Sequence, residues 1–444
     1  MVRRPSAGVQ RSAAALTSAA TVLAVWGSTV RLMCNLYLQR KGARSSLNDY
    51  GKALFLMVAL LPPLLVTVAF WIVPIGDLGA DRIAVAARDY TDMWAAGHLV
   101  ASGEGHILFD QTAFNAALKS MFGAGFTYQV WPYPPPTLLL AVPLSMLPLF
   151  PGFLMYTIGT AALLWLALRS SGLKTAACAA VVPSPAVADN ALTGQNGSLT
   201  GALLLGGLSL VQRRPVLAGV ILGALIIKPQ LGLLVPVCLV ASGSWLALLA
   251  MAISGGTLIA LSGVLFGLEA WVGFFVHTRP MIEAILQAPW QALPSQQIFA
   301  SSFMAVRSIG ASVQVATYSQ FAVTIVCAVV AWRTWRAPQV DPILRAALTG
   351  LLAVAAAPWV HSYDMIPLAV AITLLVPLAG WSCQLLLGLA WFWPGAVVIL
   401  PIPLLLSVAS VLCVTWLAWQ KVRHSDAGNC TPVRAPVALR QLAG

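Results

Sequence analysis

The chain has 444 residues, of which 59% are hydrophobic and only 9% are charged. Soluble globular domains contain about 25% charged residues, so this composition excludes a cytosolic enzyme or a secreted domain. The net charge of +12 does not indicate a nucleic-acid-binding protein, because the 25 lysines and arginines are scattered and form no patch interleaved with aromatic residues. The sequence therefore predicts a membrane protein.

The apolar residues form long, unbroken runs. Four stretches contain no charged residue: 53–76, 120–168, 229–268 and 365–420. About 20 apolar residues suffice for one helical crossing, and the alternating strands of an outer-membrane barrel are absent. We predict an all-α, polytopic membrane protein with roughly 10–13 transmembrane helices.

The N-terminal part predicts the orientation. Residues 1–52 contain eight lysines and arginines against a single acid, Asp49, and cytoplasmic segments hold the excess of basic residues. We expect residues 1–51 to form a cytoplasmic or membrane-surface extension. The first crossing is predicted at 53–76, which ends at Asp77 on the outer side.

The segment 77–132 is predicted to be a structured outer loop. It holds six of the thirteen acids, and 91–101 and 112–122 have the pattern of short amphipathic helices at the interface. Gly103 and Gly123 follow them as helix breaks.

We predict an integral membrane domain over 52–420, and pairs of basic residues indicate on which side of the membrane its later helices end. We place Arg169/Lys174, Arg213/Arg214, Arg333/Arg336 and Lys421/Arg423 on the cytoplasmic side. The stretch 134–149 is short and bounded by prolines, which predicts a re-entrant or partly spanning element. The later crossings are expected at 150–168, 175–190, 197–211, 215–227, 229–242, 245–267, 313–332, 343–357 and 365–380. A second outer loop covers 268–301, a final hairpin covers 382–419, and 421–444 is a cytoplasmic tail, so both termini lie inside.

Several polar residues fall together at the outer ends of the predicted helices. An ionisable side chain at membrane depth costs on the order of 3 kcal/mol, so such residues are candidates for function. The helix middles are nearly free of polar groups, whereas a transport path needs them at several depths. The sequence therefore predicts one polar site at the outer surface, formed by Asp89, Asp189, Gln195, Asn196, Lys228, His361 and Asp364.

Several acidic and basic residues of this region allow two interpretations. Asp89 and Asp92 are one helical turn apart and could serve as a base or hold a divalent ion, or they are solvated loop acids. Lys228 ends an apolar helix, either as a phosphate ligand or as a snorkelling lysine. His361 and Asp364 begin a helix whose N-terminus favours an anion, although an interfacial histidine would also fit.

Six short motifs follow one another along the chain: DYTDMWAAG at 89–97, Phe109-Asp110, YPPP at 133–136, GQNG at 194–197, Lys228-Pro229 and HSYD at 361–364. In this order they resemble glycosyltransferase family 87, whose members are GT-C-fold mannosyltransferases that use polyprenyl-phosphate-mannose. The resemblance covers about residues 50–380, and Met93 departs from it because a tyrosine is more usual there.

By this resemblance Asp89 is the general base that removes the proton of the acceptor hydroxyl. Lys228 and His361 would stabilise the leaving lipid phosphate, with Arg279 or Arg307 as helpers, and single displacement would invert the anomeric centre. The remaining residues expected to bind the sugar or the phosphate are Asp92, Tyr133, Gln195, Asn196 and Asp364.

The resemblance implies no cofactor and no required metal, since the lipid-linked sugar is a substrate. The acceptor would be a glycolipid or polysaccharide at the outer face of a bacterial inner membrane, and no nucleic acid takes part. The alternative is a secondary transporter or a flippase of lipid-linked sugars, which inverted repeats and midplane charges would favour.

Overall fold

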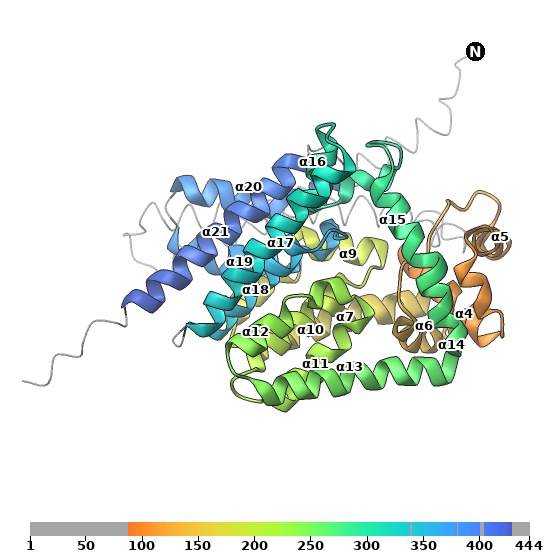
Figure 1. The fold of residues 1–444 in the computed structure, drawn as a ribbon, viewed down its shortest axis with the longest axis horizontal. Coiled ribbons are helices and arrows are strands. Elements are labelled where there is room, and N and C mark those ends of the chain that lie inside the picture. Colours follow the sequence, from red (N-terminus) through yellow and green to blue (C-terminus); the bar gives the residue numbers. More distant parts are fainter. Residues whose placement is uncertain (1–87, 338–339, 380, 400–403, 429–444) are drawn as a thin grey trace, which may run out of the picture.

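The computed structural model describes residues 88–428 except 338–339, 380 and 400–403 (Figure 1). The N-terminal extension and the first predicted crossing, 53–76, lie outside these residues. Within the described part the chain is helical, and the only extended pairing there is an isolated bridge between Phe299 and His361. The predicted all-α class is confirmed.

The described part opens with a small helical unit at one end of the molecule. It consists of α4 (Arg88–Ala101), η1 (Gly105–Phe109) and α5 (Gln111–Phe122). The Asp110 side chain caps α5 by accepting the N–H groups of Thr112 and Ala113, at 2.9 and 3.0 Å. Gly103 and Gly123 have φ angles of 82° and 96°, which glycine adopts without strain. The predicted helices and breaks of this segment are confirmed.

The next helices lead from this unit into the core. They are η2 (Pro135–Thr137), α6 (Leu138–Ser145), α7 (Leu149–Ser170), α8 (Thr175–Val181), α9 (Pro185–Thr193) and α10 (Gly197–Leu210). The eight residues of α6 rise only about 12 Å, less than half of the bilayer core, as expected for an element that spans partly. The structure corrects the continuous crossing predicted over 175–190, because Pro183 and Pro185 lack the N–H groups that would join α8 to α9.

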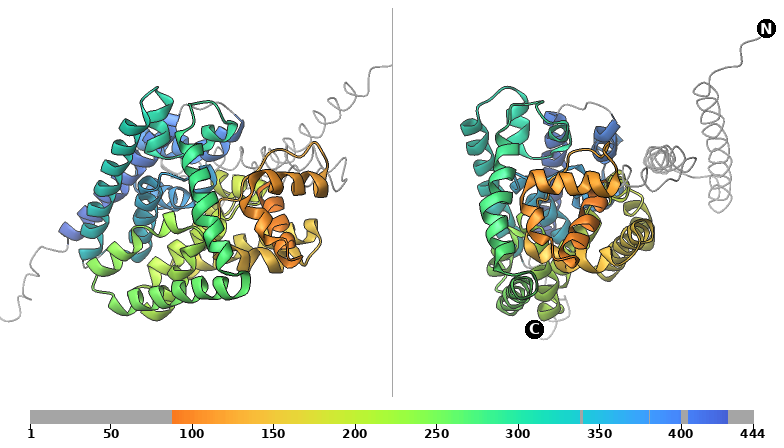
Figure 2. Two further views of the ribbon diagram at one scale, coloured as in Figure 1. Left: turned by 45° about the vertical axis from the view of Figure 1, so that its right-hand side comes forward. Right: turned by 90° about the vertical axis from the view of Figure 1, so that its right-hand side faces the viewer.

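The middle of the chain is a series of long and short helices, among which α11 and α13 pack against each other. The elements are α11 (Pro215–Gly223), η3 (Ala224–Ile227), η4 (Pro229–Gly232), α12 (Val235–Ala241), α13 (Trp245–Phe266), α14 (Leu268–Gly273), the π-helical turn η5 (Phe274–Thr278), α15 (Arg279–Gln287) and η6 (Pro294–Ile298). Figures 1 and 2 show α14 and α15 rising from the end of α13 toward α16. The predicted second outer loop, 268–301, is thus largely helical.

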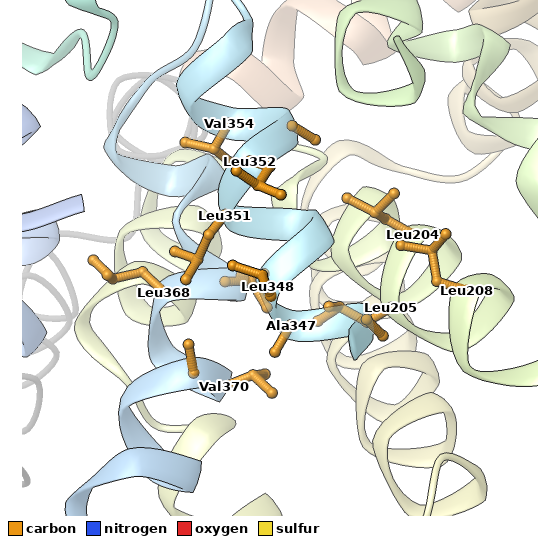
Figure 3. Close-up of a cluster of buried hydrophobic side chains, with 14 of the residues drawn as sticks. Leu204, Leu205, Leu208, Ala347, Leu348, Leu351, Leu352, Val354, Leu368 and Val370 are labelled. Carbon is orange, nitrogen blue, oxygen red and sulfur yellow. The ribbon is translucent and has the colours of Figure 1, made fainter. Parts of the chain in front are cut away.

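The C-terminal half supplies the centre of the bundle. Its elements are α16 (Ser302–Ser308), α17 (Val313–Arg336), α18 (Pro342–Ala356), η7 (Ser362–Asp364), α19 (Ile366–Leu375), η8 (Val376–Leu378), α20 (Trp381–Ile399) and α21 (Leu404–Gly428). Every residue of α18 after Pro342 is buried. It packs against α10, α17, α19 and α21, and Figure 3 shows its leucines between those of α10 and α19.

Among the described residues, four helices are long and apolar enough to cross a membrane: Leu149–Ser170, Trp245–Phe266, Val313–Arg336 and Leu404–Arg423. Seven shorter apolar helices accompany them in the same part of the chain. Large apolar side chains such as Leu166, Val264 and Phe321 are exposed on the outside of the bundle, as expected for contact with lipid. The chain is a polytopic helical membrane protein.

Candidate active site

The polar residues of the predicted site lie at breaks between apolar helices. The breaks are the start of α4, the segment before η2, the junction of α9 and α10, the junction of η3 and η4, and the connection from α18 to α19. Gly194 ends α9 with a φ of 71°, and a Cβ there would overlap Tyr90. Only a glycine therefore lets the first turn of α4, which carries Asp89, pack against the end of α9.

Lys228 and Asp364 form a buried ion pair at the centre of the site. Lys228 Nζ donates to Asp364 Oδ1 at 2.6 Å and to Asn196 Oδ1 at 3.1 Å, and it lies 4.9 Å from the centre of the Tyr363 ring. Asp364 Oδ2 accepts the backbone N–H of His361 at 3.1 Å. The pair holds η3 and η4 against the start of α19, although 136 residues separate its members.

Asp189 is a second buried carboxylate in this cluster. Ser362 Oγ donates to its Oδ2 at 2.6 Å, which links α9 to η7. Burial is the main reason that the pKa of Asp189 rises to about 7, and the negative charges of Asp89 and Asp364 raise it further against the effect of the Ser362 hydrogen bond. Burial therefore favours the protonated form of Asp189.

Tyr133 and Gln195 join the YPPP segment to the start of α10. Tyr133 OH donates to Gln195 Oε1 at 2.8 Å, and the same oxygen lies 3.4 Å from the Asn196 N–H. Burial first, and then the charge of Asp89, raise the pKa of Tyr133 well above its ordinary value. The phenol therefore stays protonated and keeps its hydrogen bond to Gln195.

His361 is enclosed by aromatic rings. Its ring centre lies 4.2 Å from that of Phe299 and 5.1 Å from that of Tyr363, on which it stacks. Burial, followed by the charge of Lys228, lowers the pKa of His361 to about 3, so the imidazole is neutral. Its Nδ1 atom is buried and has no hydrogen-bond partner among the described residues, which leaves this atom available to a ligand.

Asp89 lies at the more open side of the cluster. It is half-buried in the first turn of α4, and its charge acts on Tyr133, Tyr363 and Asp189. Asp92 follows one turn later on the same helix and is 5% exposed. The two acids of the DYTD motif are three residues apart and so lie on one face of α4, and the charge of Asp89 reaches the cluster.

The two arginines expected to help bind phosphate lie elsewhere. Arg279 is exposed on α15 and pairs with Glu283 one turn further, at 3.3 Å. The Arg307 guanidinium donates to the backbone oxygens of Gln287, Ala288 and Ala311, so it ties α16 to the end of α15. The structure does not bring either residue into the cluster.

The structure adds residues that the sequence interpretation left out of the site. Tyr363 lies beneath Lys228, and Ser362 holds Asp189. Asn190 bonds both to the side chain and to the N–H of Ser198, at 3.1 and 3.2 Å, and so fixes the α9–α10 junction. The position of Asn190 next to Asp189 in an otherwise apolar helix is the signal in the sequence that could have indicated it.

One cavity in the described part lies outside this cluster. Its volume is about 970 Å³, and it separates η1 and α5 from α13, α14 and η5. Its polar lining comes from His106, Asp110, Gln111, Glu269 and His277. None of the residues of the cluster lines it.

The raised pKa of Asp189 predicts a pH dependence of stability. Between about pH 4, the ordinary pKa of an aspartate, and pH 7, the folded protein holds a proton that the unfolded chain has released. The contribution of Asp189 to the free energy of unfolding therefore falls as the pH rises through this range. We expect Asp189→Asn to gain stability relative to wild type between about pH 4 and about pH 8, measured by chemical unfolding in detergent.

His361 provides the opposite control. Its pKa is lowered, so its contribution to the free energy of unfolding rises with pH from about 3 to its ordinary value of 6.5. His361→Gln is expected to lose stability relative to wild type as the pH rises over that interval. Parallel pH profiles of the wild type and Asp189→Asn would show that Asp189 titrates normally.

The sequence matches the family model of glycosyltransferase family 87 over residues 131–358, just over half of the chain. The matched part includes Tyr133, Gln195, Asn196 and Lys228; Asp89 lies before it and His361 after it. No curated protein and no solved structure matches the chain. With the family match and the apolar helices in agreement, the chain belongs to glycosyltransferase family 87 and is a membrane glycosyltransferase.

Proposed function

We propose that this enzyme transfers a hexose, mannose by the resemblance, from a polyprenyl-phosphate donor to a glycolipid or polysaccharide acceptor. The observation that carries the proposal is the buried cluster at the helix ends, where Lys228 lies among Asp364, Asn196 and Tyr363. An ammonium is suited to a phosphate, and nearby carboxylates are suited to a sugar hydroxyl. Both groups stand where apolar helices end.

The proposed reaction is a single displacement. The acceptor hydroxyl oxygen forms a bond to the anomeric carbon while the bond from that carbon to the phosphate oxygen breaks. Asp89 takes the hydroxyl proton, and the lipid phosphate leaves with the bonding electrons. Attack opposite to the leaving group inverts the anomeric centre.

The leaving phosphate would be stabilised by donors already in position. Lys228 has three N–H groups, of which two donate to Asp364 and Asn196, so the third can donate to a phosphate oxygen. In its Nδ1–H tautomer, His361 can donate to the phosphate from Nδ1, for which the described part of the chain supplies no partner. These donors stabilise the negative charge that develops on the leaving phosphate. The proposal therefore requires no cofactor or metal.

The membrane setting favours a lipid-linked donor. A polyprenyl tail stays in the bilayer between the apolar helices while its phosphate-sugar head reaches the helix ends. The acidic segment 77–132 and the basic pairs elsewhere support an active site on the outer face of a bacterial inner membrane, with both termini in the cytoplasm.

The test is sugar transfer by the purified full-length protein in lipid nanodiscs. We expect radiolabelled mannose to pass from synthetic polyprenyl-phosphate-mannose to membrane glycolipids, and no transfer from GDP-mannose. Transfer from the nucleotide sugar alone would overturn the proposed donor. Movement of the lipid-linked sugar across a liposome membrane without a new glycosidic bond would support the flippase alternative.

A further inference from the structure

A second cavity in the described part lies on the lipid-facing side of the bundle. It is a groove of about 600 Å³ between α7 and α11, and α10 forms its floor. This volume is within the range of roughly 300–1,000 Å³ that small-molecule sites occupy. The groove is apolar apart from Ser170 and two arginines, Arg213 and Arg214.

The floor of the groove is one face of α10. Ala202, Leu203, Gly206 and Leu210 line it, whereas the opposite face of the same helix packs its leucines against α18 (Figure 3). Leu163, Leu166 and Leu217 on the walls are 42%, 62% and 41% exposed. Their exposure shows that the groove opens toward lipid.

The two arginines close one end of the groove. Their backbone N–H groups both donate to the Leu210 carbonyl oxygen, at 3.0 and 2.8 Å, so the turn that carries them is fixed at the end of α10. Both side chains are exposed, and within the described residues neither has a carboxylate partner. The groove therefore has an apolar lining and, at one end, two arginines without a carboxylate partner among the described residues.

This place is separate from the candidate active site. Asn196 and the cluster stand at the start of α10, and the arginines stand at its end. The 14 residues of α10 rise about 21 Å between them. The groove follows the C-terminal part of α10, so a ligand in it would not reach Lys228 or Asp364.

We propose that this groove binds an anionic glycerophospholipid of the bilayer. One acyl chain lies along α10 between α7 and α11, and the headgroup phosphate is bound by Arg213 and Arg214. The charge argues for an anionic lipid, because guanidinium groups bind phosphate oxygens through paired N–H donors. Basic pockets between membrane helices bind anionic headgroups in the same way.

The test compares two lipids with identical acyl chains on the full-length protein. The detergent-purified protein is incubated with an equimolar mixture of phosphatidylglycerol and phosphatidylcholine, and retained lipid is counted by native mass spectrometry. We expect the wild type to retain phosphatidylglycerol with a preference of roughly tenfold or more. The double variant Arg213→Gln/Arg214→Gln should lose this preference. Equal retention of the two lipids by the wild type would overturn the proposal.

Two further variants separate the groove from a general charge effect. Arg333→Gln/Arg336→Gln removes the same charge from an exposed basic pair on α17 that does not line the groove, and it should retain the wild-type preference. Leu203→Trp fills the groove and keeps both arginines, so it should lower phosphatidylglycerol retention even if the arginine variant fails to fold. Equal loss in both arginine variants, or unchanged retention in Leu203→Trp, would contradict the site.

Discussion

Replacing Asp89 by asparagine is expected to lower the rate of sugar transfer roughly 10²–10⁴-fold, the usual contribution of a general base. Asparagine has nearly the same size and remains compatible with the first turn of α4, but it cannot accept the proton of the acceptor hydroxyl. The stability of the variant should therefore stay close to that of the wild type. The measurement is the turnover number with saturating lipid-linked donor, together with the thermal unfolding midpoint.

Asp341→Asn is the matched control for this experiment. Asp341 caps α18 by accepting the N–H groups of Ile343 and Leu344, at 3.1 and 3.0 Å, and asparagine is an equally good cap. Its transfer rate should equal that of the wild type. Full activity of Asp89→Asn combined with a loss in Asp92→Asn would move the base one turn along α4.

Replacing Lys228 by methionine is expected to lower the free energy of unfolding by about 3–5 kcal/mol, because removal of one member of a buried ion pair leaves an uncompensated charge. Lys228 is 4% exposed, and the Asp364 side chain is fully buried. Adding Asp364→Asn to this variant removes the remaining charge. The double variant should therefore be more stable than Lys228→Met alone, in unfolding measured by denaturant titration in detergent.

The exposed pair of Arg279 and Glu283 provides the comparison. Both of its side chains are more than half exposed, and surface ion pairs contribute at most about 1 kcal/mol. Arg279→Met should therefore change stability little. Similar losses in Lys228→Met and Arg279→Met, or a double variant as unstable as Lys228→Met, would show that burial of the pair at the centre of the site does not determine its energy.

Much of the helical layout could be predicted from local sequence. Prolines and glycines interrupt the apolar runs, and the start of α10 after Gly194 and the end of α5 at Gly123 follow from them. The apolar run over 175–190 predicts one crossing, but it forms the two helices α8 and α9 because prolines flank Ser184. The ion pair between Arg279 and Glu283 follows from their helical spacing of four residues.

The gathering of polar residues could be predicted, but their pairing could not. Membrane topology puts Asp189, Lys228 and Asp364 at equivalent helix ends, because each ends or begins an apolar run. It does not determine which helix ends are neighbours, and this depends on side-chain packing around α18. The hydrogen bond from Ser362 to Asp189 and the position of Tyr363 under Lys228 therefore required the three-dimensional structure.

The long separation of the bonded residues sets an order of events during synthesis. Lys228 leaves the ribosome 136 residues before Asp364, and Asp189 leaves 173 residues before Ser362. At cellular rates of elongation the first gap lasts on the order of ten seconds. Throughout that interval the ammonium at the end of η3 has no carboxylate from the α19 side, so the region can complete its packing only after residue 364 has been made. A chain that stops before residue 364 keeps the apolar helices of its first half but leaves the centre of the site unassembled.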